Sequence, residues 1–231
     1  MNLPYQVFSI RILSLNFALM LFCFFNNETF AQSKDTLVNE FSAQLAASGD
    51  QKIRIVNEQQ MLAKTDFDKG FAHNSAGEFN EGISTLKKAI EIDYTGNCGS
   101  GDDGAAFNEL GYAYTRLKNY DSARLHLDKA IALNPSYTKA YLNKSVVFMQ
   151  QKQFDESIAV LNTLLQAKPD LAMVFAQRGF VYKAKGDTQH AIEDFKKYLE
   201  LTKDKKQDDN MLALRKDVEK QLKKLENPSE K

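Results

Sequence analysis

The sequence predicts an all-α solenoid of stacked helical hairpins, and three observations carry that prediction. One pattern of large and small residues recurs at a step of 34, so that Phe107, Tyr141 and Phe175 occupy the same place in three successive copies. Within each copy, apolar residues fall at steps of three and four, as they do on one face of a helix. Pro135 and Pro169 end the first two copies, because a proline cannot continue a helix.

Each copy divides into two helical segments joined by a polar break. Gly111 and Ala123 are small residues where two antiparallel helices come close, and Leu127 fills the space between them. One such hairpin cannot bury its apolar face alone, so the copies must stack into a continuous core. The other matching positions are Leu110, Tyr114 and Ala130 in the first copy, Lys144, Ser145, Phe148, Ser157, Leu161 and Leu164 in the second, and Gly179, Tyr182, Ala191, Phe195 and Tyr198 in the third.

These offsets resemble those of the tetratricopeptide repeat (TPR), over residues 63–203 and most strongly over 104–201. The resemblance implies an all-α, right-handed α-solenoid of about four TPR helix–turn–helix repeats with N- and C-terminal capping helices. It assigns residues 104–137 to TPR 2, 138–171 to TPR 3 and 172–203 to TPR 4.

Residues 1–31 have the pattern of a secretory signal peptide. Arg11 precedes an apolar run over residues 12–25, and Ala31 stands at a signal-peptidase position just before Gln32. The run is shorter than the roughly 20 residues of a spanning helix, so we expect cleavage and no stable membrane span afterwards. The residues around the expected cut, Thr29-Phe30-Ala31 followed by Gln32, resemble signal peptides of Gram-negative bacteria of the Bacteroidota type. This resemblance implies export to the periplasm or the cell surface of a Gram-negative bacterium. An uncleaved membrane anchor is the alternative.

Residues 32–62 lack the repeat marks and are predicted to form an N-terminal helical cap of two helices, separated at Gly49. The cap either covers the end of the solenoid or folds into its groove as a lid. Residues 63–94 are interpreted as a degenerate TPR 1, which keeps Gly70 but carries His73 where the family has a tyrosine.

Residues 95–103 are a Gly-rich insertion between the first two repeats, predicted to be a flexible connector that exposes Cys98. Asp103 is predicted to cap the helix that begins near Gly104. The segment has neither the ending of a phosphate-binding loop nor the spacing of a calcium loop. At the other end, residues 209–226 are predicted to be a C-terminal capping helix with an apolar face made by Met211, Leu214, Val218, Leu222 and Leu225.

Composition and spacing argue against catalysis and against nucleic-acid binding. The formal net charge is +0, whereas nucleic-acid-binding surfaces are basic. His73 is expected in the core, and His126 and His190 on outward faces of second helices. No His pair or Cys–His set has the spacing of metal ligands. We therefore expect a non-enzymatic protein with no catalytic residue, no metal and no cofactor.

In TPR proteins the first helix of each repeat lines a groove, at offsets 2, 5, 9, 12 and 13 of the repeat. Offset 9 is apolar or aromatic in all four repeats here, which predicts an apolar strip along the groove floor with basic residues at its edge. The predicted peptide-binding groove residues are Phe71, Asn108, Tyr112, Arg116, Lys139, Leu142, Val146, Met149, Met173, Phe180 and Lys183.

The strip predicts an exported interaction scaffold that binds an apolar or amphipathic protein segment, with a preference for acidic flanks or a carboxylate. The carboxylate clamp of some TPR proteins is matched only at Lys139 and Asn143, so we do not expect chaperone-tail binding. The alternative is a structural subunit of an envelope oligomer, its groove covered by its own N-terminal helices. An accessory part of an enzyme or signalling system also stays open.

Overall fold

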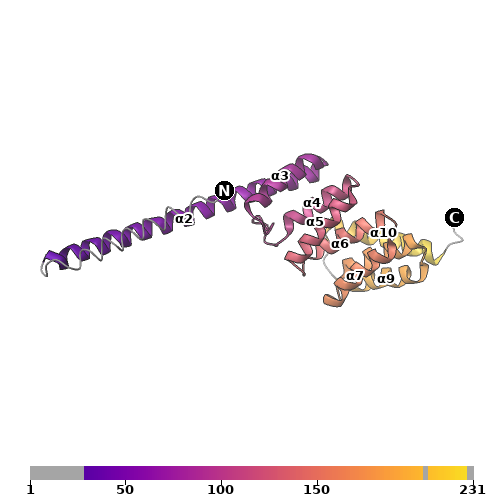
Figure 1. Ribbon diagram of the computed structural model, residues 1–231. Coiled ribbons are helices and arrows are strands. Elements are labelled where there is room, and N and C mark those ends of the chain that lie inside the picture. Colours follow the sequence, from indigo (N-terminus) through magenta and orange to yellow (C-terminus); the bar gives the residue numbers. More distant parts are fainter. Residues whose placement is uncertain (1–28, 205–207, 228–231) are drawn as a thin grey trace. The chain divides into compact units, whose positions relative to one another are not determined.

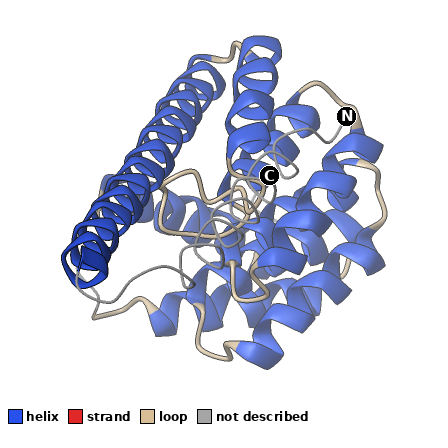
Figure 2. Cartoon of the chain, turned by 60° about the vertical axis from the view of Figure 1, so that its left-hand side comes forward, coloured by secondary structure: helices blue, strands red, loops and turns tan. Residues whose placement is uncertain are grey.

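The computed structural model describes residues 29–204 and 208–227, and their regular structure is helical (Figures 1 and 2). The chain forms two units, residues 1–56 and 57–231. Residues 1–28 of the predicted signal peptide lie outside the described residues. Among the helices that the structure describes, none is both long enough and apolar enough to cross a bilayer.

Helix α2 (Thr29–Ala76) runs without a break through Gly49 and through the boundary between the two units. The predicted separation of two cap helices at Gly49 is therefore wrong. A glycine inside a helix costs only about 1 kcal/mol relative to alanine, and nothing after Gly49 stops the helix. Whether residues 32–62 act as a cap stays a prediction.

The remaining helices follow the predicted order of hairpins. They are α3 (Phe79–Ile92), α4 (Ala105–Arg116), α5 (Tyr120–Leu133), α6 (Thr138–Gln150), α7 (Phe154–Ala167), α8 (Ala172–Lys185), α9 (Thr188–Leu201) and α10 (Asp209–Glu226). From α3 to α9 each helix contacts the next in sequence, and α4 and α8 also contact α6 directly. The first helices α4, α6 and α8 thus lie in a row, and we call their shared side the first-helix face.

Close contacts between small and large residues hold the hairpins together. A Cβ atom added to any of three glycines on first helices would lie 2.5–2.6 Å from a side chain of the following helix. Only glycine permits this approach. The three pairs are Gly70 with Leu86, Gly111 with Leu127, and Gly179 with Phe195. The hairpin of α2 and α3 is therefore held by the same kind of contact as the later hairpins.

Helix α10 packs on the last hairpin. Val218 is fully buried in a cluster with Phe195 and Tyr198. The helix begins after Asp208, whose carboxylate accepts a hydrogen bond of 2.8 Å from the backbone N–H of Met211. Its apolar side chains cover the core surface that α9 would otherwise expose to water.

The insertion 95–103 is a hydrogen-bonded loop and not the flexible connector that its glycines predict. The Asp93 carboxylate accepts bonds from Thr95 N at 3.1 Å and from Cys98 N at 2.8 Å. Gly104 N donates to Thr95 O at 2.9 Å and closes the loop. One carboxylate that precedes the loop thus satisfies the backbone donors within it.

Cys98 and Asp103 do not take the positions predicted for them. Cys98 is only 1% exposed, and burial together with the negative charge of Asp93 raises the pKa of its thiol to about 12. Cys98 is thus a buried, protonated thiol and not the exposed side chain that was predicted. Gly104, with φ 81°, precedes α4 without a side-chain cap, and Asp103 accepts a bond from Asn97 Nδ2 at 3.1 Å instead.

Two of the three histidines also differ from expectation. His73 is partly exposed, with Nδ1 2.7 Å from Glu78 Oε2, and is not a core residue. His190 is exposed on α9 as predicted. His126, predicted to face outward, stacks with the rings of Tyr114 at 5.4 Å and Phe107 at 6.1 Å. Its Nδ1 is buried and has no hydrogen-bond partner among the described residues.

His126 makes the packing of α4 and α5 sensitive to acid. Burial lowers the pKa of His126 below 6.5, and the positive charges of Lys87 and Lys129 lower it further. The unfolded chain therefore takes up this proton at higher pH than the folded chain does, so stability is lost as pH falls from about 6.5 to the lower folded-state pKa.

We expect the variant His126→Phe, which keeps an aromatic ring but cannot be protonated, to lose less stability than the wild type between pH 7.5 and pH 5.5. Urea unfolding followed by circular dichroism at both pH values measures this difference. Equal losses in the two proteins would show that His126 does not titrate in this way.

Candidate interaction groove

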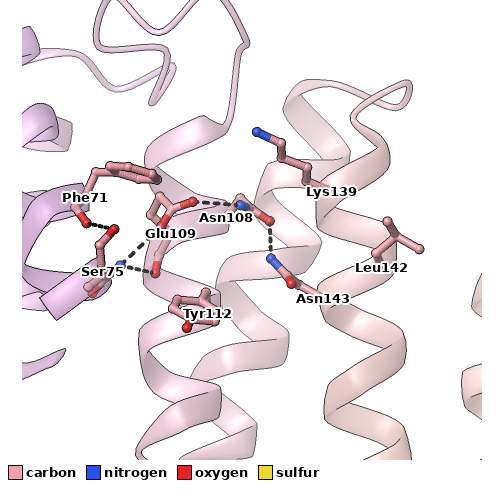
Figure 3. A pocket seen from close by; sticks show the side chains of 9 residues that line it. Phe71, Ser75, Asn108, Glu109, Tyr112, Lys139, Leu142 and Asn143 are labelled. Atoms are coloured by element: carbon pink, nitrogen blue, oxygen red, sulfur yellow. Dashed lines mark hydrogen bonds between the residues drawn. The ribbon is translucent and has the colours of Figure 1, made fainter. Parts of the chain in front are cut away.

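Two hollows lie on the first-helix face. The polar hollow lies between α2, α4 and α6 and has a volume of about 340 Å³. Its lining combines amides, a carboxylate and an ammonium with two aromatic rings (Figure 3). The lining residues are Phe71, Asn74, Ser75, Asn108, Glu109, Tyr112, Lys139, Leu142 and Asn143.

The apolar hollow lies between α6 and α8 and has a volume of about 400 Å³. Apolar side chains of α6 and α8 face each other across it. Its lining residues are Val146, Met149, Gln177, Phe180, Lys183 and Ala184. Helix α6 contributes to both hollows, so the two follow one another along the array.

Most of the residues predicted for the groove gather at these hollows. Phe71, Asn108, Tyr112, Lys139 and Leu142 line the polar one, and Val146, Met149, Phe180 and Lys183 line the apolar one. Their arrangement is thus as the repeat offsets predict, whereas their role in binding stays a prediction.

Arg116 and Met173 line neither hollow. Arg116 lies over the Phe79 ring, 5.0 Å from its centroid, and donates a hydrogen bond of 2.9 Å to the hydroxyl of Tyr112. Met173, at the start of α8, is 41% exposed. Arg116 thus positions the ring of Tyr112, which itself lines the polar hollow.

The aromatic side chains of the face rest on the helices behind them. The Phe180 ring meets the fully buried Phe195 ring of α9 edge to face, with centroids 5.1 Å apart. Tyr112 meets Phe79 of α3 in the same manner at 6.1 Å. Such contacts hold the rings in place and leave one side of each turned to the hollow.

Three asparagines and Glu109 form a hydrogen-bonded network in the polar hollow (Figure 3). Asn143 Nδ2 donates to Asn108 Oδ1 at 2.9 Å, and Asn108 Nδ2 donates to Glu109 Oε1 at 3.3 Å. Asn74 Nδ2 donates to Glu109 Oε2 at 3.3 Å and to the carbonyl of Glu109 at 3.1 Å. The network joins α2, α4 and α6.

The Glu109 carboxyl is partly withdrawn from water. Burial raises its pKa above the usual value, while the hydrogen bond from Asn74, the positive charge of Lys139 and the hydrogen bond from Asn108 oppose the shift. The sequence interpretation missed this residue, although it stands at the centre of the network.

Three of the missed residues share a repeat position. Glu109, Asn143 and Gln177 are spaced by 34 residues and all line a hollow, so offset 6 of the repeat also faces the groove here. Asn74 and Ser75 stand at offsets 12 and 13 of the first repeat. Three polar residues at the repeat spacing were the signal that could have identified offset 6.

The basic edge predicted along the strip is present in part. Lys183 donates a bond of 2.5 Å to Gln221 Oε1 of α10, whereas the Lys139 ammonium has no hydrogen bond or ion pair with a described residue. No three His, Cys, Asp or Glu side chains in the described parts of the chain are grouped so that they could hold a metal ion.

Comparison with known proteins identifies the repeats. Three family models, each described as a tetratricopeptide repeat, match residues 69–138, 114–176 and 174–205. Among curated proteins, stress-induced-phosphoprotein 1 of Caenorhabditis elegans is 27% identical over 132 residues, covering 54% of this chain and 40% of that protein. Sperm-associated antigen 1 of Rattus norvegicus is 27% identical over 113 residues, covering 49% and 12%. The chain thus spans less than half the length of either relative.

Solved structures share the fold. MamA is 26% identical with a TM-score of 0.53, covering 65% of this chain and 84% of its own. PilF of Pseudomonas aeruginosa is 19% identical with a TM-score of 0.56, covering 72% of each chain. YrrB, described as a TPR protein with an unusual peptide-binding site, is 19% identical with a TM-score of 0.51, covering 77% and 88%. With repeat matches that together run from residue 69 to residue 205, the chain belongs to the tetratricopeptide repeat proteins.

Proposed function

We propose that the chain is a non-enzymatic interaction scaffold that binds a peptide or protein segment along its first-helix face. The observation that carries the proposal is the pair of hollows in series on α2, α4, α6 and α8. Aromatic and aliphatic side chains line both hollows, and Phe71 is 51% exposed. Exposed apolar surface of this kind is usually a binding site.

The fold supports this proposal, because TPR arrays present a continuous surface built from equivalent positions of successive repeats. The structure of YrrB is described as containing a peptide-binding site and shares the fold of this chain. A shared fold does not specify a ligand, so the chemistry of the partner has to come from the hollows themselves.

We also propose that the chain is exported to the periplasm or the surface of a Gram-negative bacterium. The support is the sequence of residues 11–31, with one basic residue, an apolar run and small residues before Gln32. Mass spectrometry of the protein from its own cells should find a mature N-terminus at Gln32. An intact Met1 in the cell envelope would favour the uncleaved anchor.

Site-specific photo-crosslinking tests the binding face. A benzophenone amino acid replaces Phe180, an aromatic residue of the apolar hollow, or Leu125, which is 66% exposed on α5. We expect ultraviolet light to give adducts with another protein from position 180 and not from position 125, in cells of the organism that encodes the chain.

Adducts only from position 125, or none from either position, would contradict the proposal. A crosslink from position 180 to residues 32–62 of the same chain would contradict it as well. It would support the alternative, in which the N-terminal helix fills the groove.

A further inference from the structure

Glu109 is a partly buried carboxylate that is held by neutral donors. It lines the polar hollow, and its two oxygens accept hydrogen bonds of 3.3 Å from the neutral amides of Asn74 and Asn108. It forms no ion pair with any described residue. Carboxylates withdrawn from water are normally paired with a cation, because neutral donors only partly replace the lost hydration.

Lys139 on α6 lines the same hollow as Glu109 on α4 (Figure 3). Its positive charge lowers the pKa of Glu109, but it forms no ion pair with this carboxylate. Each of these charged groups therefore lines the same hollow without an ion-pair partner among the described residues. A bound segment can complete both pairs.

We propose that the polar hollow receives a basic side chain of the partner segment, a lysine or an arginine, with Glu109 as its counter-charge. The inference rests on the proposed function of the first-helix face and adds the chemistry of one position in the ligand. Phe71 of α2 and Tyr112 of α4 line the hollow together with Glu109, and their rings offer surface to the stem or the cationic head of such a side chain.

The rest of the face favours a segment of mixed character. An acidic residue is favoured beside Lys139, whereas a carboxylate directed at Glu109 would meet a like charge. The apolar hollow, lined by Val146, Met149 and Phe180, takes a large apolar side chain. The expected partner segment therefore combines one basic residue, an acidic neighbour and an apolar anchor.

Selection of random peptides displayed on phage by the full chain tests this assignment. We expect peptides enriched on the wild type to carry Lys or Arg together with a large apolar residue. On Glu109→Gln the apolar residue stays enriched and the basic one does not, while Lys139→Gln, the matched control, keeps the basic preference. Thermal unfolding by circular dichroism checks that both variants fold.

A second measurement needs no variant of the protein. In a synthetic peptide from the enriched set, replacing the basic residue by glutamine should weaken binding to the wild type by about tenfold in fluorescence anisotropy. A change of less than about twofold would overturn the assignment of Glu109.

The outcomes distinguish failure of the Glu109 assignment from failure of the proposed function. In one outcome the enriched peptides depend on Phe180 for binding but carry no basic preference, or keep the same basic preference on Glu109→Gln. Either result overturns the inference and leaves the groove proposal in place. Failure to enrich any peptide, or enrichment that is indifferent to Phe180→Glu, overturns the proposed function and the inference with it.

Discussion

Replacing Asp194 by alanine is expected to lower the free energy of unfolding by about 3–5 kcal/mol. The Asp194 side chain is 7% exposed and that of Arg178 is 19% exposed. The carboxylate accepts two hydrogen bonds from the guanidinium, of 2.8 and 2.7 Å. Its removal leaves the partly buried guanidinium of Arg178 without its counter-charge, which costs far more than the net contribution of an intact ion pair.

Urea unfolding followed by the helical circular dichroism signal measures the loss, with two controls. The double variant Arg178→Met/Asp194→Leu removes both charges and should lose less than Asp194→Ala does. Asp155→Ala breaks an exposed pair with Lys185 and should leave the midpoint almost unchanged. A small effect of Asp194→Ala, similar to that of Asp155→Ala, would show that water or another residue replaces the lost partner.

The ion pair also matters for the binding face. Arg178 Nη1 donates to Asn162 Oδ1, so the guanidinium ties α8 to α7 as well as to α9. Helix α8 carries Phe180 and Gln177 into the apolar hollow. The placement of the α8 residues that line this hollow therefore depends on the charge network of Arg178 on the same helix.

The fold could be predicted because its determinants recur along the sequence. Gly111 with Leu127 and Gly179 with Phe195 are pairs of small and large residues with the same spacing, and the structure brings both pairs into contact. Steric fit of this kind depends only on residue size and on position within the repeat. The repeat period of the sequence therefore predicts this steric fit.

Single side-chain hydrogen bonds and stacking contacts could not be predicted in this way. The loop around Cys98 is ordered by the carboxylate of Asp93, and glycine content alone suggests a flexible segment. His126 faces the rings of Phe107 and Tyr114, because small differences in helix rotation decide whether a half-buried position faces a neighbour or water. Among the described residues, the bond to Cys98 N and the stack of His126 on Phe107 and Tyr114 are not repeated at the 34-residue step, so periodicity does not predict them.

The candidate site was predictable where it follows repeat offsets and not where it departs from them. Offset 9 selected Tyr112, Val146 and Phe180, which line the hollows. Glu109 was missed because the family's groove offsets 2, 5, 9, 12 and 13 do not include offset 6. In this chain the residues at offset 6 also line the hollows.

The double variant Val146→Glu/Phe180→Glu is expected to weaken partner binding by at least about a hundredfold. Both residues line the apolar hollow, and a bound apolar anchor would have to withdraw two new carboxylates from water. Met149→Glu, in the same hollow, provides a second variant if the double variant unfolds. Leu125→Glu, on the exposed side of α5, is the matched control and should bind as the wild type does.

Affinity capture of the tagged full chain from solubilised cells of its own organism, beside Val146→Glu/Phe180→Glu and Leu125→Glu, tests the central claim most directly. The account predicts that mass spectrometry finds at least one protein with the wild type and with Leu125→Glu that is absent with the double variant. Identical sets of proteins with all three would contradict a scaffold that binds through its first-helix face.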